Sequence, residues 1–277
     1  MFIMPDFNFE IERATLLLNN NMLAHSMHPA SFAKYKNAFR GRDVVLVATG
    51  PTLKQFRPIP GAIYVGVNRA FQYDKVKLDF LFMADYCGLT YIEDAAKIAA
   101  KKFYGILRHD MFTENDRSPM IPESIAIRHR AARYYANAVH DAKIQKDLDY
   151  PFDLNVQALT CYGSIALHAM QFILWSNPRR IYIVGCDTNH AGYFDSDGAS
   201  SLGINIVTRG WIKMKEFIDV YYPETEVISV NPVGLRGIFK DWDQNDQNAQ
   251  PQQRRRFPHA VSFCPKIFQP HPRHPMH

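Results

Sequence analysis

Six short runs of apolar, mostly β-branched or aromatic residues recur along this chain, and each ends abruptly at a polar residue or a tight turn. Runs of this length, bounded by turn signals, are typical of buried strands. A chain that repeats this pattern is expected to stack the strands in one sheet and to cover both faces of it. The predicted strands span residues 43–48, 62–67, 80–84, 103–107, 180–184 and 226–230.

Helical segments separate the predicted strands. Residues 9–37, 95–102 and 211–221 have helical composition, and residues 164–175 are apolar enough for a buried helix, which the following Asn-Pro ends. Strands that alternate with helices predict an α/β fold, here a Rossmann-like, mostly parallel sheet with helices on both faces. In such sheets a ligand sits outside the carboxyl ends of the strands, near the point where the strand order reverses.

Three segments surround this predicted core. We expect residues 1–40 to form a helical lead-in to an α/β domain of residues 41–242, and residues 243–277 to form a polar, flexible tail. The stretch from 111 to 153 is polar and rich in Arg, His and Tyr. It predicts a small, partly helical lid over the site, and a solvated helical face is the alternative.

Composition limits the class of partner. The 277 residues are 47% hydrophobic and carry a net charge of +5, part of which comes from the arginines at 254–256. This mild excess suits a small anionic ligand and is too weak to argue for nucleic acid. The four cysteines lack the spacing of a metal site.

The same composition bears on localisation. No apolar stretch approaches the roughly 20 residues of a transmembrane helix, and no signal peptide is evident. We therefore expect a cytoplasmic protein without a transmembrane segment. Peripheral membrane contact and homo-oligomer formation stay open.

Small and polar residues follow the first two predicted strands. Thr49, Gly50 and Pro51 come directly after the first, where a glycine lets backbone N–H groups approach a phosphate or ribose. Asn68 and Arg69 follow the second; the amide suits a base or sugar hydroxyl, and the guanidinium suits phosphate. An ordinary strand-to-helix turn and a solvated arginine are the alternatives.

Later strand ends repeat this pattern. Asp85 follows the third strand, and Gly163 and Ser164 precede the buried helix. Asp187 lies just past the strand at 180–184, where a carboxylate needs a hydroxyl, an N–H group or a cation as its partner. The alternative for Asp187 is a helix-capping aspartate.

The loop after Asp187 carries further candidates. The ring of His190 can accept a proton near neutral pH, and the phenol of Tyr193 could donate to a departing phosphate. Asp195 and Asp197 could ligate a divalent metal, although their sequence is also that of a solvated turn. Because no third ligand is evident, we predict no metal site.

In this order the motifs resemble the bacterial sialyltransferases of Campylobacter type and the related motility-associated, flagellin-modifying glycosyltransferases. That superfamily opens with a strand and a Gly-x-Gly-Pro-Ser-Leu turn, which residues 48–53 resemble, with Ala for the first Gly and Thr for the Ser. Its second strand ends in an asparagine, as at Asn68. A turn with Ser and Gly then opens a buried helix, as at 161–164, and a later strand ends in Gly-x-Asp, as at 185–187. The resemblance covers residues 41–240.

The resemblance implies an inverting glycosyltransferase that moves sialic acid or a related sugar from a CMP-linked donor to a glycan acceptor, without a metal or other cofactor. Thr49, Gly50 and Asn68 would line the nucleotide, and Gly163 and Ser164 the ribose or phosphate. Further donor contacts would come from Pro51, Arg69, Asp85 and Arg209.

In the family a histidine deprotonates the acceptor and two tyrosines assist the leaving phosphate. Only Tyr193 falls where such a tyrosine is expected, and the position of the histidine is occupied by Thr-Arg-Gly at 208–210. We therefore predict a catalytic group of His190, Asp187 and Tyr193, with His190 as the base and Asp195 as an alternative base.

Two other functions stay open on sequence alone. A Mg²⁺-dependent pyrophosphokinase, similar to archaeal pterin-modifying relatives, would hold the metal on carboxylates such as Asp85, Asp187 or Asp195. A non-catalytic nucleotide-binding module would explain the absent family histidine. The preferred glycosyltransferase requires that Thr49, Asn68, Ser164 and Asp187 converge around a single cleft.

Overall fold

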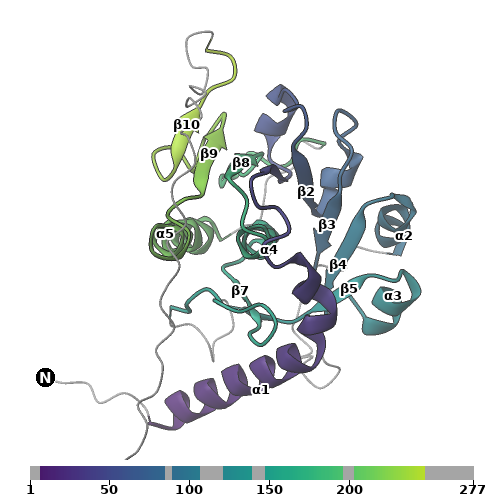
Figure 1. The fold of residues 1–277 in the computed structure, drawn as a ribbon, viewed down its shortest axis with the longest axis vertical. Helices are drawn as coiled ribbons and strands as arrows, with labels where there is room; N and C mark the ends of the chain where they lie inside the picture. Colours follow the sequence, from purple (N-terminus) through teal and green to yellow (C-terminus); the bar gives the residue numbers. More distant parts are fainter. Residues whose placement is uncertain (1–6, 85–88, 107–120, 139–146, 196–202, 247–277) are drawn as a thin grey trace, which may run out of the picture.

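Most strands of this chain build one parallel sheet. The computed structural model describes residues 7–84, 89–106, 121–138, 147–195 and 203–246. Within them, eight parallel strands are ordered β10-β9-β8-β1-β2-β3-β4-β5 (Figure 1). The chain adds β2 to β5 on one side of β1 (Asp43–Val47) and then places β8 (Arg180–Val184) on its other side. The strand order therefore reverses between β1 and β8, and the predicted Rossmann-like α/β fold is confirmed.

The predicted strands are all present, with ends shifted by at most two residues. Sequence analysis did not predict β5, β6, β7 or β10, each of which is three residues long. Two of these, β6 (Ala136–Ala138) and β7 (Leu159–Cys161), form a separate parallel pair. The other strands of the main sheet are β2 (Ile63–Val67), β3 (Phe80–Met83), β4 (Lys101–Gly105), β5 (Ala132–Tyr134), β9 (Glu226–Val230) and β10 (Lys240–Trp242).

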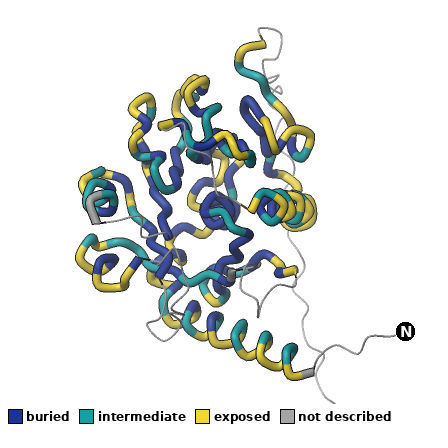
Figure 2. Tube along the Cα trace, turned by 180° about the vertical axis from the view of Figure 1, so that it is seen from behind, coloured by how far each residue is buried: buried dark blue, intermediate teal, exposed yellow. Residues whose placement is uncertain are grey.

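Side chains that alternate along the strands build two cores, one on each face of the sheet. In β1, Val44 and Leu46 belong to the first core, and Val45 and Val47 to the second. Figure 2 shows the buried chain lying between the outer helices. The first face carries α1 (Phe7–Phe32), the 3₁₀ turn η1 (Ala33–Tyr35), α4 (Ile165–Trp175) and α5 (Ile204–Tyr221). The second carries η2 (Pro51–Gln55), η3 (Asn68–Gln72), α2 (Leu89–Lys97) and α3 (Glu123–Arg128).

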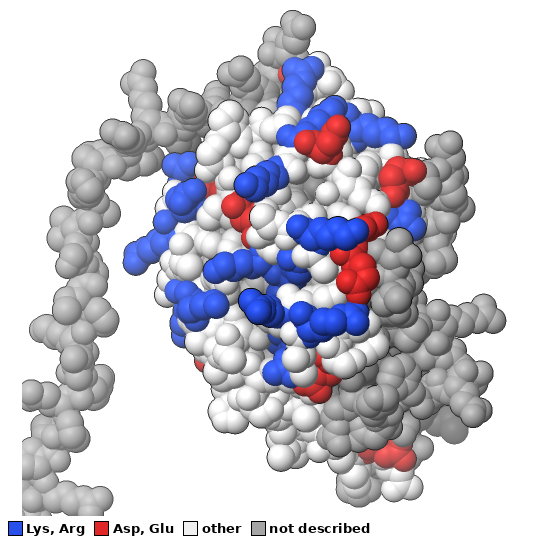
Figure 3. All heavy atoms as spheres, turned by 90° about the vertical axis from the view of Figure 1, so that its right-hand side faces the viewer, with Lys and Arg blue, Asp and Glu red and all other residues white. Residues whose placement is uncertain are grey.

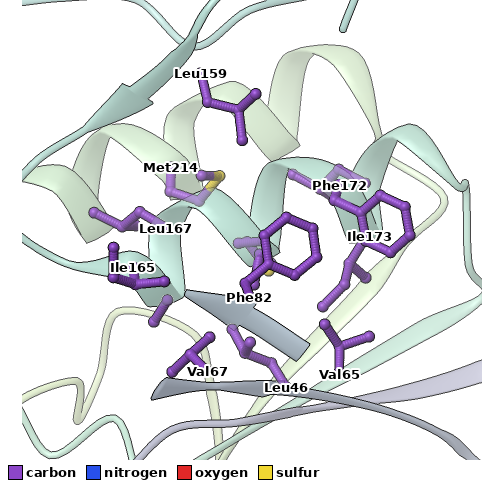
Figure 4. Close-up of a cluster of buried hydrophobic side chains, with 14 of the residues drawn as sticks. Leu46, Val65, Val67, Phe82, Leu159, Ile165, Leu167, Phe172, Ile173 and Met214 are labelled. Atoms are coloured by element: carbon purple, nitrogen blue, oxygen red, sulfur yellow. The ribbon is translucent and has the colours of Figure 1, made fainter. Parts of the chain in front are cut away.

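The central element of the first core is α4, whose residues are all buried. Figure 4 shows Leu167 and Phe172 of this helix above Val65 and Phe82 of the strands. The one buried amide of α4, Gln171, exchanges two hydrogen bonds of 2.8 Å with the backbone of Thr160 in β7. These bonds fix α4 against β7, because a buried amide without partners would be costly.

Aromatic rings join the N-terminal helix to this core. Phe82 of β3 and Phe103 of β4 stack with their centroids 4.6 Å apart, and Phe32 of α1 stacks on Phe103 at 5.5 Å. Tyr35 of η1 meets Phe103 edge-on at 5.8 Å. The predicted lead-in is therefore part of the folded body. Each such ring pair adds about 0.5–1.5 kcal/mol beyond simple burial.

Three expectations differ from the structure. The helix predicted at 95–102 lies earlier, at α2, because residues 101 and 102 pair with β3 as the start of β4. Of the expected lid, residues 121–138 form α3, β5 and β6, and residues 147–153 lie against α5, where the Tyr150 hydroxyl donates to the carbonyl of Gly210. β5 is an edge strand of the sheet, and none of these residues lines the cleft described below. The start of the expected flexible tail is bonded to the body through Gln244. The rest of that tail lies outside the described residues.

None of the described helices combines the length and apolar character that crossing a bilayer requires.

Replacing Gly210 of α5 with alanine is expected to destabilise the protein by about 1–2 kcal/mol. In most helix interiors this change stabilises, because alanine is the better helix former. Here the new Cβ atom would lie 2.5 Å from Cβ of Tyr162 and 2.7 Å from Cδ1 of Leu167. Chemical denaturation followed by circular dichroism measures the sign. A stabilised variant would show that α5 can move away from α4.

Candidate functional site

A cleft opens where the strand order reverses. It lies at the carboxyl ends of β1, β2 and β8, between the first turn of α4 and the side of α5, and it encloses about 210 Å³. This is the place where open α/β sheets bind their ligands. A volume below the usual ~300–1,000 Å³ of small-molecule pockets is enough for only part of a nucleotide-sugar, so the rest would lie at the open mouth.

Seven of the predicted site residues line this cleft. The four on which the sequence prediction depended, Thr49, Asn68, Ser164 and Asp187, all face it although they lie far apart in the chain. The predicted convergence is therefore present in the structure. The other three that line the cleft are Gly50, Gly163 and Tyr193.

Backbone hydrogen bonds hold the chain just past β1 against the end of β8. The N–H group of Gly50 donates to the carbonyl of Gly185 at 2.7 Å, and the N–H group of Ala48 donates to Val184 at 2.8 Å. Gly185 adopts a left-handed φ of 66°, which glycine allows at little cost. A side chain on Gly50 would meet Asp187 and the Gly185 carbonyl within 2.7 Å. The floor of the cleft thus requires glycine at residue 50.

Asp187 caps the turn that follows β1. One carboxylate oxygen accepts a hydrogen bond of 2.8 Å from the backbone N–H of Thr52, and the other accepts a short hydrogen bond from the Thr52 hydroxyl. Burial raises the pKa of Asp187 above its ordinary value, and the two bonds from Thr52 partly offset that rise. These contacts agree with the capping role that was the alternative prediction for Asp187. Asp187 positions the Gly-Pro-Thr turn, and both of its oxygens are already engaged.

Asn68 presents a hydrogen-bonding group at the cleft. The residue follows β2 directly and has a left-handed φ of 46°, a conformation that asparagine tolerates better than most residues. Its Oδ1 atom is buried and has no hydrogen-bond partner in the described part of the chain. A buried acceptor without a partner is unfavourable. A ligand N–H or O–H group in the cleft would satisfy it.

The first turn of α4 borders the cleft. Gly163, Ser164 and Ile165 line the cleft, and the Ser164 side chain makes no capping bond to the helix. The first turn carries no acidic residue. The partial positive charge of a helix amino end therefore remains available for an anion such as a phosphate.

A short loop crosses the mouth of the cleft and is bonded to both neighbouring strand ends. The N–H group of Phe194 donates to the carbonyl of Thr49 at 2.8 Å. Arg69 forms an ion pair with Asp195, with nitrogen and oxygen 3.2 Å apart, and its guanidinium lies 5.3 Å from the ring centroid of Tyr193. These contacts hold Tyr193 against the cleft. They also occupy Arg69 and Asp195 with each other.

The remaining predicted residues do not line the cleft. His190 is exposed, so the geometry does not support its predicted role as base. Arg209 points to another neighbour and pairs with Asp147 at 3.3 Å. Pro51 begins η2 and is not among the residues that line the cleft. Asp85 lies outside the described residues.

No metal cluster supports the pyrophosphokinase alternative among the residues that the structure describes. They contain no group of three or more His, Cys, Asp or Glu side chains placed to hold a metal ion. Of the carboxylates considered for Mg²⁺, Asp187 is bonded to Thr52 and Asp195 to Arg69.

Several cleft residues were missed by sequence analysis. Trp211 of α5 lines the cleft and is buried, but its place in an amphipathic helix marks it only as core. Two cysteines line the cleft as well: Cys161 is the last residue of β7, and Cys186 lies two residues past the end of β8. Burial raises the pKa of the Cys186 thiol well above its ordinary value. The available signal was position, because both cysteines stand at carboxyl ends of strands.

Comparison with known proteins adds no family. No protein-family model matches this chain, and no curated protein matches it. The resemblance to sialyltransferases and flagellin-modifying glycosyltransferases therefore stays a prediction.

Proposed function

We propose that this protein is a glycosyltransferase whose cleft binds a nucleotide-sugar linked through a single phosphate, such as a CMP-linked sugar. The observation that carries the proposal is the convergence of Thr49, Asn68 and Ser164 beside the first turn of α4. These residues offer hydroxyls, an amide and free backbone N–H groups, which recognise ribose, base and phosphate.

The charge of the lining favours one phosphate over two. Among the described residues that line the cleft, there is no Lys, Arg or His, and the acidic one, Asp187, is bonded to Thr52. A helix amino end carries only about half a positive charge. It matches the single negative charge of a phosphodiester better than the greater charge of a diphosphate.

Of the predicted catalytic residues, Tyr193 lies where its side chain could take part in sugar transfer. It lines the cleft at its mouth, where a phenol could donate a proton to the departing phosphate oxygen. Asp187 acts in this proposal as a positioning residue through Thr52. Residues 196–202 and 85–88, on which part of the site prediction falls, lie outside the described residues.

Binding of CMP in the presence and absence of Mg²⁺ tests the proposal. In a thermal-shift and titration series with CMP, CDP, UDP, GDP and ATP, CMP is expected to bind most tightly and to raise the unfolding midpoint most. Asn68→Asp keeps a residue that tolerates left-handed φ but places a negative charge at the cleft. It is expected to weaken CMP binding about tenfold or more.

The matched control is Asn19→Asp, which makes the same chemical change on the exposed side of α1. It should bind CMP like the unaltered protein. Equal CMP binding by Asn68→Asp, or binding of ATP with Mg²⁺ but not of CMP, would contradict the proposal.

One observation favours a second candidate, a non-catalytic nucleotide-binding module. The oxygens of Asp187 are already bonded, and His190 does not line the cleft, so neither is placed as a base. Release of CMP from CMP-sialic acid in the presence of glycan acceptors separates the two functions. Tight CMP binding without release, across the acceptors tried, identifies the module.

A further inference from the structure

A second cavity lies near the β5 edge of the sheet, away from the cleft. It is bounded by the end of α1 and η1, the start of β4 and the segment that leads into β5, and it encloses about 510 Å³. The lining contains Lys101, the first residue of β4, and Ala132, the first residue of β5. The cavity therefore opens at the amino ends of these strands, whereas the cleft lies at carboxyl ends.

The charge of this lining is one-sided. It contains five cationic side chains and the ring of His129, and no acidic residue lines it in the described part of the chain. We call this the basic cavity. Its cationic residues are Lys34, Lys101, Lys102, Arg130 and Arg133.

Most of these charges have no acidic partner. Arg133 pairs with Glu123. Within the described residues, none of the remaining four forms an ion pair with a carboxylate. The basic cavity thus differs from the mouth of the cleft, where Arg69 is paired with Asp195.

The fold brings these like charges together. The ammonium groups of Lys34 and Lys101 lie 5.2 and 5.6 Å from the centroid of one ring, that of Tyr35. Lys102 is half-buried, donates to the carbonyls of Ile98 and Ala100, and has a pKa that burial lowers. Holding like charges close together is unfavourable unless an anion lies between them.

The surrounding surface continues the same sign of charge. Figure 3 looks onto the side of the molecule that carries α2 and α3, where Lys and Arg are spread widely and Asp and Glu are fewer. Such a surface attracts anions over a distance of about one Debye length, ~8 Å at physiological salt. The basic cavity gives an attracted anionic group a place to enter.

We propose that the basic cavity is a second binding site, separate from the cleft, that takes a phosphate-bearing group with two or more negative charges. Ammonium and guanidinium groups are the side chains that proteins use most for phosphate. The phosphate could belong to a soluble molecule or to a lipid headgroup. Both present the same chemistry to the cavity.

Two probes separate these sources. Inorganic pyrophosphate, measured by titration calorimetry, represents a soluble phosphate. Vesicles of phosphatidylcholine with phosphatidylinositol 4-phosphate, whose headgroup carries more than one negative charge, represent a lipid surface. Their binding is measured by co-sedimentation against pure phosphatidylcholine vesicles. At least one probe is expected to bind, and raising the salt concentration is expected to weaken that binding.

A triple variant assigns the binding to the cavity. Lys34→Gln, Lys101→Gln and Arg130→Gln remove three exposed charges, and the combined variant is expected to bind at least about tenfold more weakly. The control removes the same charge elsewhere, from lysines 54, 75 and 77, which are exposed and do not line the cavity. It should retain binding. Circular dichroism and the thermal midpoint check that both variants fold.

Each outcome decides the proposal. Binding of pyrophosphate or of anionic vesicles that only the cavity variant loses supports it and names the source. No binding of either probe overturns it, as does equal loss in both triple variants or unchanged binding in the cavity variant. Asn68→Asp in the cleft should leave this binding unchanged; if that variant removes pyrophosphate binding, the anion site is the cleft and the proposal is wrong.

Discussion

Replacing Gly50 with alanine is expected to lower the free energy of unfolding by about 3 kcal/mol and to remove CMP binding in the cleft. Gly50 has a φ of −69°, which any residue can adopt, so the backbone itself is not strained by the change. The added Cβ atom would lie 2.6 Å from Cγ of Asp187 and 2.7 Å from the carbonyl oxygen of Gly185. Neither neighbour can give way cheaply, since Asp187 holds Thr52 and the Gly185 carbonyl accepts the Gly50 N–H group.

The control for this variant is Gly203→Ala at the start of α5. Gly203 has the same φ of −69°, and the nearest atom to its added Cβ would be Cδ1 of Ile206, at an ordinary 3.6 Å. Its stability should change by less than about 0.5 kcal/mol. Urea denaturation gives the stability of both variants, and CMP titration gives their binding. If Gly50→Ala binds CMP normally, the turn after β1 is not part of the ligand site.

The main strands could be predicted because each is a continuous apolar run buried on both faces of the sheet. Residues 180–184 and 226–230 were predicted with the ends that β8 and β9 have in the structure. The three-residue strands β5, β6, β7 and β10 carry no such signal. A strand this short is defined by its neighbour, as Ala132 of β5 is by its pairing with Phe103 of β4.

The cleft could be predicted to the extent that strand ends define it. Asn68 directly follows β2, and Thr49 and Asp187 lie within three residues of the ends of β1 and β8. Because these strands are adjacent and parallel, their carboxyl ends lie at the same end of the sheet. Side chains further along the loops have no such constraint. The positions of His190 and Arg209 depend on the path of a loop and on the rotation of a helix, which hydrophobic periodicity does not specify. Neither residue lines the cleft.

Asp187 shows why residue type alone did not settle a role. A buried carboxylate past a strand end predicts a hydroxyl, an N–H group or a cation as its partner, with a helix cap as the alternative, but the sequence does not say which residue supplies it. The partner is Thr52, 135 residues earlier in the chain. Because β1 and β8 are adjacent, a residue after one strand can cap the turn after the other, and this contact is visible only once the strand order is known.

Two buried histidines are neutral in the folded protein. His28 of α1 donates from Nδ1 to the carbonyl of Leu154 and accepts the N–H group of Tyr135 at Nε2, both at 2.9 Å. Burial lowers its pKa to about 4. His168 of α4 is fully buried with Nδ1 3.1 Å from the Tyr134 hydroxyl, and burial lowers its pKa to about 3. An unfolded histidine has a pKa of about 6.5.

Acidification from pH 7 to pH 5 is therefore expected to cost the protein about 4 kcal/mol of its free energy of unfolding. In this range the unfolded chain binds protons at both histidines while the folded protein does not, so stability falls as pH falls below 6.5 and continues to fall until pH 3–4. Each histidine contributes about 2 kcal/mol by pH 5.

Urea denaturation at pH 7, 6 and 5 measures the decline. His28→Gln or His168→Gln should remove about half of it, whatever their stability at pH 7, because glutamine does not titrate. His25→Gln, at an exposed position of α1, should retain all of it. Equal stability at pH 5 and pH 7, or an unchanged decline in both buried-site variants, would show that these rings are charged or hydrated in the folded protein.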